Sequence, residues 1–188
     1  MKNGLDHEDY WLLTPLDEAL IAAKSRANRL GFAVLLVFFR DRGRFPRIGS
    51  EIDGNWVKEL ASQFNLEGAL DYGTIINGRT AERYRAEIRL RFGFREATVN
   101  DADILIDWLR DHAVADAFGD IEKLVTILEL RFCELAIELP SADRIERIVR
   151  ASINAHDEKF YSRIYARLSP ITCIQLDDLL QGFKLSQV

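Results

Sequence analysis

The chain is constrained most strongly by an uninterrupted apolar run of nine residues, from Gly31 to Phe39. A membrane-spanning helix needs about 20 apolar residues, so this run is too short to cross a bilayer. Its core, AVLLVFF, could form a strand by itself. However, the helical period places Leu30, Val34 and Phe38 on one stripe, and the length of the segment favours a helix. The run therefore predicts a buried helix over residues 25–39.

The rest of the chain also shows the period of helices, without an internal repeat. A long helix after residue 140 should bend or break near Asn154 and end before Pro170. The expected fold class is all-α, with two small helical domains that divide near residues 98–100, at residues 1–98 and 99–188. The remaining helices are expected over residues 16–23, 55–64, 67–72, 80–92, 102–114, 121–135 and 174–183.

Several residues are typical of helix ends. Thr14 is suited to cap a helix whose first residue is Pro15, because proline lacks the N–H that would be unpaired there. Thr80 is the expected N-cap of the helix over residues 80–92, and Gly93 is its expected C-cap. Asn100 or Asp101 is expected to cap the next helix.

The composition is that of an ordinary globular protein. Of the 188 residues, 48% are apolar and 29% are charged, which suffices to bury a core. The N-terminal residues MKNGLDHEDYW include acids where a signal peptide would be apolar, so secretion is not expected. Cys133 and Cys173 are too far apart in sequence to suggest a disulfide framework or a zinc pair. A reducing cytoplasm fits this pattern.

Basic residues are concentrated in two segments, although the net charge is −5. Residues 24–47 contain seven basic residues and one acid, and residues 79–95 contain six arginines and two glutamates. Such segments can form a positive face on an acidic body, and a phosphate responds to the local charge. The alternative is an ordinary solvated helix surface. We expect the two segments to lie on one continuous face that meets nucleic acid.

The sequence contains no motif of a known catalytic site. It lacks a P-loop and the patterns GxGxxG, HExxH, GxSxG and CxxC. Its histidines have no helical partner at the spacing of metal ligands. Asp101, Asp103 and Asp107 could suggest a metal site, but acids in a first turn are explained by the helix dipole. We expect no catalytic residue, no metal site and no cofactor in this chain.

Two segments are typical of helix-turn-helix units. In the first, the helices over 55–64 and 67–72 lead to the arginine-rich helix, whose open face carries Arg79, Thr80, Arg83, Ala86 and Arg89. In the second, residues 121–135 lead to a helix whose open face carries Ser141, Arg144 and Arg147. A reading helix inserts its N-terminal half into the major groove. Helical bundles also carry arginine on outer faces, so the pattern by itself is weak.

The same segments resemble the large replicative transposases of the Tn-three family (TnpA). The similar stretches are SRANRLGFAVLLVFFRDRGRFP, GRTAERYRAEIRLRFGFREATVNDAD and PSADRIERIVRASI, followed by ARLSP and LDDLL. They cover about Leu13 to Leu180 in the order of the family. The resemblance implies a helical region of tandem helix-turn-helix modules that recognises the terminal inverted repeats of a transposon. It also implies that the catalytic acids lie downstream, in a ribonuclease-H-like domain outside these residues.

The sequence thus predicts a DNA-binding part of a DDE-type transposase that performs no reaction alone. Its expected partner is the double-stranded DNA of transposon ends, with no membrane, and the full-length enzyme could be a dimer. The protein would be cytoplasmic and associated with the nucleoid when bound. The alternatives are a helical protein–protein interaction module and a stand-alone regulator of transposition. Phosphate contacts are expected from Lys24, Arg26, Arg29, Arg42, Arg44 and Arg47, and base contacts from Arg79 and Arg83, with Thr80, Arg89, Ser141, Arg144 and Arg147 as further contacts.

Overall fold

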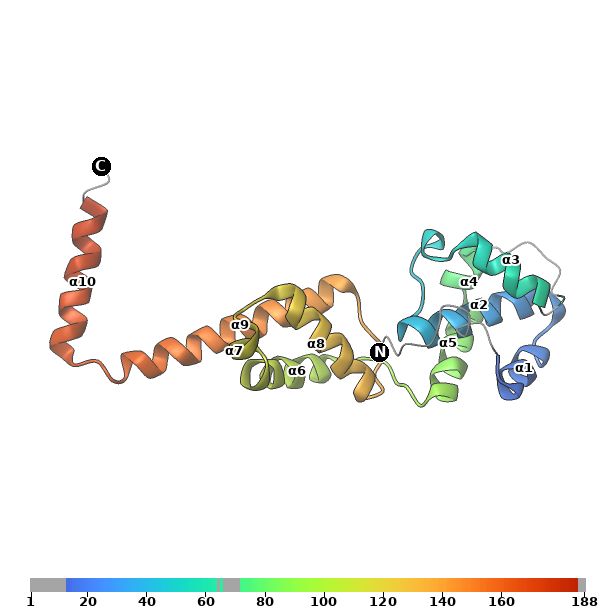
Figure 1. The fold of residues 1–188 in the computed structure, drawn as a ribbon, viewed down its shortest axis with the longest axis horizontal. Coiled ribbons are helices and arrows are strands. Elements are labelled where there is room, and N and C mark those ends of the chain that lie inside the picture. The colour runs from blue at the N-terminus through green and yellow to red at the C-terminus, as the bar shows by residue number, and fades with distance from the viewer. Residues whose placement is uncertain (1–12, 64, 66–71, 186–188) are drawn as a thin grey trace. The chain divides into compact units, whose positions relative to one another are not determined.

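The computed structural model describes residues 13–63, 65 and 72–185. These residues form helices without a β-strand, and two extended segments meet in a single parallel bridge between Arg95 and Ile137. The all-α prediction is confirmed. The helices (Figure 1) are α1 (Pro15–Ala22), α2 (Arg26–Arg42), the short 3₁₀ helix η2 (Gly49–Glu51), α3 (Gly54–Gln63), α4 (Tyr72–Asn77), α5 (Arg79–Phe92), α6 (Val99–His112), α7 (Val114–Ala117), α8 (Ile121–Glu134), α9 (Ala142–Tyr165) and α10 (Pro170–Leu185).

The chain forms two compact units. The first comprises Met1–Thr98 together with Glu129–Ser141, and the second comprises Val99–Leu128 together with Ala142–Val188. One boundary between the units lies after Thr98. No feature of the sequence indicated that Glu129–Ser141 would return to the first unit.

Helix α2 is the centre of the first unit. Every residue from Gly31 to Phe39 is buried, because α1, α3, α4 and α5 all pack against this helix. Phe32 meets the ring of Tyr84 edge-on, with 5.1 Å between the ring centroids. At Gly31 a Cβ atom would lie 2.9 Å from Cγ1 of Ile75, so a larger residue would force the side chain of Ile75 or α4 to shift. The predicted buried helix is confirmed, and it ends at Arg42 before Gly43, whose φ is 65°.

Helices α6 and α9 form the core of the second unit. Leu105 and Leu109 of α6 are buried, as are Ile145, Ile148 and Val149 of α9. Helix α9 continues without interruption through Asn154, so the predicted break there is wrong. The segment after Asn154 is held to α6 by the side chains of His156 and Lys159, which reach Arg110 O (3.2 Å) and Asp111 Oδ1 (2.8 Å), respectively.

The predicted helix ends are partly correct. Thr14 and Asp17 form a reciprocal capping box ahead of Pro15, and Gly93 ends α5 with a φ of 72°. Thr80 is not an N-cap, because α5 begins at Arg79 and its cap is Gly78. Helix α6 begins at Val99, so Asn100 and Asp101 lie inside its first turn rather than at its cap. The helix predicted over 67–72 lies almost entirely outside the described residues; only Tyr72, which opens α4, is described.

Replacing Ile88 by alanine should lower the free energy of unfolding by about 2–5 kcal/mol, because the side chain of Ile88 is completely buried against α2. Leu90 is the matched control, since it lies on the same helix but is 81% exposed, and Leu90→Ala should change stability by less than about 0.5 kcal/mol. Urea denaturation of both variants measures the difference. Equal losses would show that α5 presents a different face to the core.

Candidate nucleic-acid interface

One side of α5 carries a row of exposed residues at the spacing of a helical face. Arg79, Arg83, Ala86 and Leu90 follow each other at intervals of four, three and four, and all are exposed. We call this row the α5 strip. The opposite side of the helix buries Ala81, Tyr84 and Ile88. The predicted orientation of α5 is therefore correct for Arg79 and Arg83 and for the apolar side. Arg89, expected on the open face with them, is only 15% exposed and is paired with carboxylates.

The start of α5 is attached closely to α4. Only Gly78 separates the two helices, and it provides no side-chain cap for the first N–H groups of α5. The guanidinium of Arg85 donates a hydrogen bond to the carbonyl oxygen of Ile76, at 2.7 Å, and so holds the end of α4. Arg83 lies over the ring of Tyr84 at 5.5 Å and remains exposed. The hydrogen bond of Arg85 to Ile76 thus holds the junction of α4 and α5, where the N-terminal half of the α5 strip begins.

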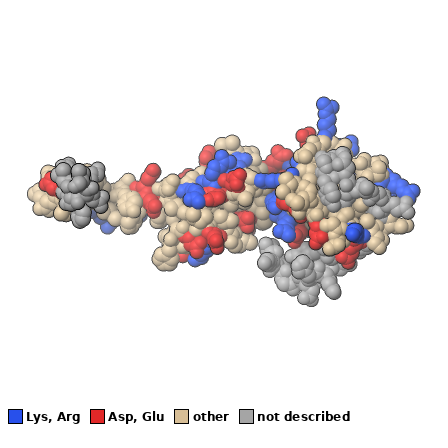
Figure 2. Space-filling model, turned by 90° about the horizontal axis from the view of Figure 1, so that it is seen from above, with Lys and Arg blue, Asp and Glu red and all other residues tan. Residues whose placement is uncertain are grey.

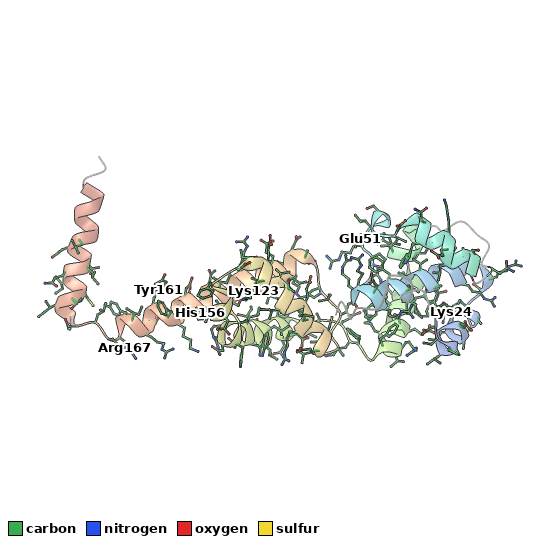
Figure 3. The ribbon with its side chains drawn as sticks, in the orientation of Figure 1. Lys24, Glu51, Lys123, His156, Tyr161 and Arg167 are labelled. Carbon is green, nitrogen blue, oxygen red and sulfur yellow. The ribbon has the colours of Figure 1, made fainter. Side chains whose placement is uncertain are left out.

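Lys24 and Arg29 stabilise the connection between α1 and α2. Figure 3 labels Lys24. Its Nζ donates to both carboxylate oxygens of Glu87, at 2.5 and 2.6 Å, and lies over the ring of Phe32. Arg29 donates to the carbonyl oxygens of Lys24 and Ala22. These contacts occupy some of the donors of both side chains that were expected to bind phosphate.

Asp17 is a buried carboxylate between two arginines. Its side chain is 1% exposed and accepts hydrogen bonds from the N–H of Thr14, at 3.0 Å, and from Nε of Arg91, at 3.1 Å. Nη1 of Arg40 lies 3.6 Å from Oδ2 of Asp17, the oxygen that also accepts from Thr14, whereas Arg91 contacts Oδ1. Burial lowers the pKa of Arg40, and the charge of Asp17 opposes this effect. The carboxylate therefore joins α1, α2 and α5 at one point.

The loop after α2 contains both paired and exposed arginines. Arg44 forms an ion pair with Glu51, at 2.5 Å, and lies over the ring of Phe38. Burial acts to raise the pKa of Glu51, but hydrogen bonds from the backbone of Arg47 and the side chain of Arg44 outweigh burial and lower it. The side chain of Arg42 is 63% exposed beside Asp41, and Arg47 is also exposed.

Arg89 attaches the returning segment to the first unit. Its guanidinium pairs with Glu138, at 2.7 Å, and with Glu96, at 2.5 Å. The backbone of Arg95 bonds to that of Ala136 and Glu138, and the N–H of Leu139 donates to the carbonyl oxygen of Gly43. After a turn at residues 135–136, residues 137–141 are therefore an extended connection bonded to other segments of the first unit.

Part of the charge in the two basic segments is thus balanced by carboxylates from outside the segment concerned. On the face drawn in Figure 2, Lys and Arg are intermixed with Asp and Glu. Counting charges within a segment could not reveal partners such as Glu87 for Lys24, which is 63 residues away. Five carboxylates pair with basic residues of these segments, and each lies outside the segment of its partner. They are Asp17, Glu51, Glu87, Glu96 and Glu138.

The residues of the second predicted reading face fall in different units. Ser141 belongs to the first unit, whereas Arg144 and Arg147 belong to the second. Arg144 is half-buried, and Arg147 is exposed with Nε donating to the carbonyl oxygen of Asp143 at 3.3 Å. Within the described part of the chain, no cluster of three or more His, Cys, Asp or Glu residues could hold a metal ion. None of the described helices is long and apolar enough to cross a membrane.

Comparison with known proteins decides the family. The family model described as Domain of unknown function (DUF4158) matches residues 3–152, which is most of the chain. The chain belongs to the DUF4158 family. The match extends from the N-terminal residues to Ser152 of α9.

Two relatives of this DUF4158 chain are transposases of Escherichia coli. The chain is 27% identical over 157 residues to the transposase for transposon Tn21, and 26% identical over 160 residues to the transposase for transposon Tn3926. These matches cover 82% and 84% of the chain but 16% of each relative. The resemblance to Tn-three-family transposases is therefore confirmed, and the chain spans about a sixth of the length of these relatives.

Replacing Asp17 by asparagine should destabilise the DUF4158 chain by about 2–3 kcal/mol, because Arg40 and Arg91 would keep their charges without a carboxylate. The loss should be smaller than for a fully buried pair, since both arginine side chains are partly exposed. Asp41→Asn is the control, because the pair of Asp41 with Arg42 is exposed and should contribute less than about 1 kcal/mol. Thermal unfolding distinguishes them. A loss for Asp17→Asn no larger than for Asp41→Asn would contradict this role.

Proposed function

We propose that this chain is the DNA-binding part of a transposase and recognises the terminal inverted repeats of a transposon. The observation that carries the proposal is the α5 strip. Arg79 and Arg83 are exposed on it, and no carboxylate partner of either is found among the described residues. By contrast, Lys24, Arg44 and Arg89 are paired within the fold. The family relationship supports the same function, because the relatives are transposases.

In this proposal α5 lies in the major groove, and its N-terminal half carries the arginines that reach the bases. Arg79 and Arg83 would each bind a guanine through the O6 and N7 atoms, which suit the fork of a guanidinium. Thr80 and the uncapped N–H groups after Gly78 would contact a phosphate, since the start of a helix attracts anions. These contacts match the order of a helix-turn-helix reader, with α4 as the preceding helix.

The phosphate contacts are fewer than the sequence suggested. The proposal retains Arg26, Arg42 and Arg47 because these residues are exposed, Arg42 in an ion pair with Asp41 at the surface. It omits Lys24, Arg29, Arg44 and Arg89, because opening their internal contacts to reach a phosphate would cost part of the binding energy. In the second unit, Arg144 and Arg147 remain secondary contacts.

The chain would bind and position transposon ends, and strand cleavage and joining would be performed by a catalytic domain of the whole transposase. No residue described here is proposed to be catalytic or to bind a cofactor. The bound protein would act at the nucleoid in the cytoplasm, and the whole enzyme could act as a dimer. A stand-alone regulator would use the same DNA contacts, without a catalytic domain.

A helical protein–protein interaction module is the second candidate. It is favoured by exposed apolar side chains on the second half of α9 and on α10, which have the composition of a docking surface. These side chains are Phe160, Tyr161, Ile164, Tyr165, Ile171, Ile174, Leu176 and Leu179.

Arg83→Ala should weaken binding to the terminal repeat by about 1–3 kcal/mol and relax the preference at one or two base pairs, because a base contact is lost. Arg42→Ala should weaken binding to the repeat and to a scrambled duplex equally and reduce the salt slope by about one, because only a phosphate contact is lost. Fluorescence anisotropy at several salt concentrations measures both effects.

Arg150→Ala is the control for this pair, since Arg150 is exposed on α9 and pairs with Glu146. Its affinity for both duplexes should be unchanged. If Arg83→Ala lowers both affinities equally, Arg83 contacts phosphate and α5 does not read the sequence. If none of the variants changes binding, the interaction module becomes the better explanation.

A further inference from the structure

The C-terminal half of the α5 strip is apolar and exposed. Leu90 is 81% exposed, and Ala86 lies one turn before it on the same face as Arg79 and Arg83. An exposed leucine by itself needs no explanation. Here the leucine continues the line of two arginines, so a ligand that lies along the arginines would also cover Leu90.

Charged neighbours of this apolar half are already neutralised. Glu87 is bound by Lys24, and Arg89 is bound by Glu96 and Glu138. The carboxylate of Glu87 therefore does not repel a phosphate beside Leu90, and Arg89 does not add a second positive charge. A ligand would meet positive charge at the beginning of the strip and methyl groups at its end.

The length of the strip fits several base pairs. Arg79 and Leu90 are separated by about 16 Å along the helix axis, at 1.5 Å per residue. This distance corresponds to roughly five base-pair steps of 3.4 Å. In the major groove the C5 methyl group of thymine is the apolar feature of a base edge, and small or apolar side chains contact it.

We propose that Ala86 and Leu90 read thymine methyl groups, so that the DNA site of α5 has guanines beneath Arg79 and Arg83 and thymines beneath the end of the strip. This inference rests on the proposed function and specifies its substrate. Glu82 is exposed beside the first half of the strip. Its carboxylate can accept a hydrogen bond from the amino group of a cytosine paired with one of these guanines.

The test replaces every thymine of the terminal-repeat duplex by deoxyuridine, which lacks only the methyl group. The whole chain should bind the deoxyuridine duplex about fourfold more weakly for each methyl group that it contacts, which is the effect of burying one methyl group. Leu90→Ala should bind the normal duplex more weakly than the unmodified chain does. This variant should also lose less affinity on replacement of thymine, because part of the methyl contact is already absent.

Leu16→Ala is the matched control, because Leu16 is a 55% exposed leucine on α1. It should retain the full thymine dependence of the unmodified chain. Thermal unfolding confirms that both leucine variants are folded, and Leu90→Gln provides a variant that keeps the length of the side chain and loses its apolar character. Leu90→Gln should also lose thymine dependence.

Three results would overturn the inference. If the unmodified chain prefers the repeat over a scrambled duplex but binds the deoxyuridine duplex equally well, the methyl contact is absent while the proposed function stands. If Leu90→Ala and Leu16→Ala show the same thymine dependence, the contact is made by another residue. If the unmodified chain does not prefer the repeat at all, the proposed function and this inference fail together.

Discussion

The burial of α2 on all sides is the constraint on which the first unit depends. A helix with apolar side chains around its whole circumference is stable in water only when other helices surround it. Residues Gly31–Phe39 are therefore enclosed by α1, α3, α4 and α5. The contact of Phe32 with Tyr84 and that of Phe39 with Phe92 fix how α5 is turned about its own axis. The outward direction of the α5 strip follows from this packing.

Arginine has two separate roles in this unit. Arg40 and Arg91 meet the buried carboxylate of Asp17, and Arg89 holds the returning segment through Glu138. A guanidinium suits this role because its five donors can contact a carboxylate while its apolar stem packs on the core. Arg79 and Arg83 have the second role: they are exposed on the α5 strip, and neither has a carboxylate partner among the described residues. We propose that these two arginines contact DNA.

The sequence was sufficient to predict features with a local cause. The helical period of the run before Arg40 predicted α2, and the spacing of Tyr84 and Ile88 predicted the buried side of α5. It could not reveal interactions between distant residues. Arg91 reaches Asp17 across 74 positions and Arg89 reaches Glu138 across 49, and nothing local marks such pairs. For this reason the ion pairs inside the basic segments could not be foreseen, and neither could the return of Glu129–Ser141 to the first unit.

The most direct test of the proposed function is a titration of the whole chain against a duplex of the terminal inverted repeat and a scrambled duplex of equal composition, at several salt concentrations. Specific readers of DNA bind their site about 10³-fold or more tightly than other sequences, and their affinity falls with salt because phosphates are neutralised. We expect both properties here. Equal affinity for the two duplexes at every salt concentration would contradict the proposal that this chain recognises transposon ends.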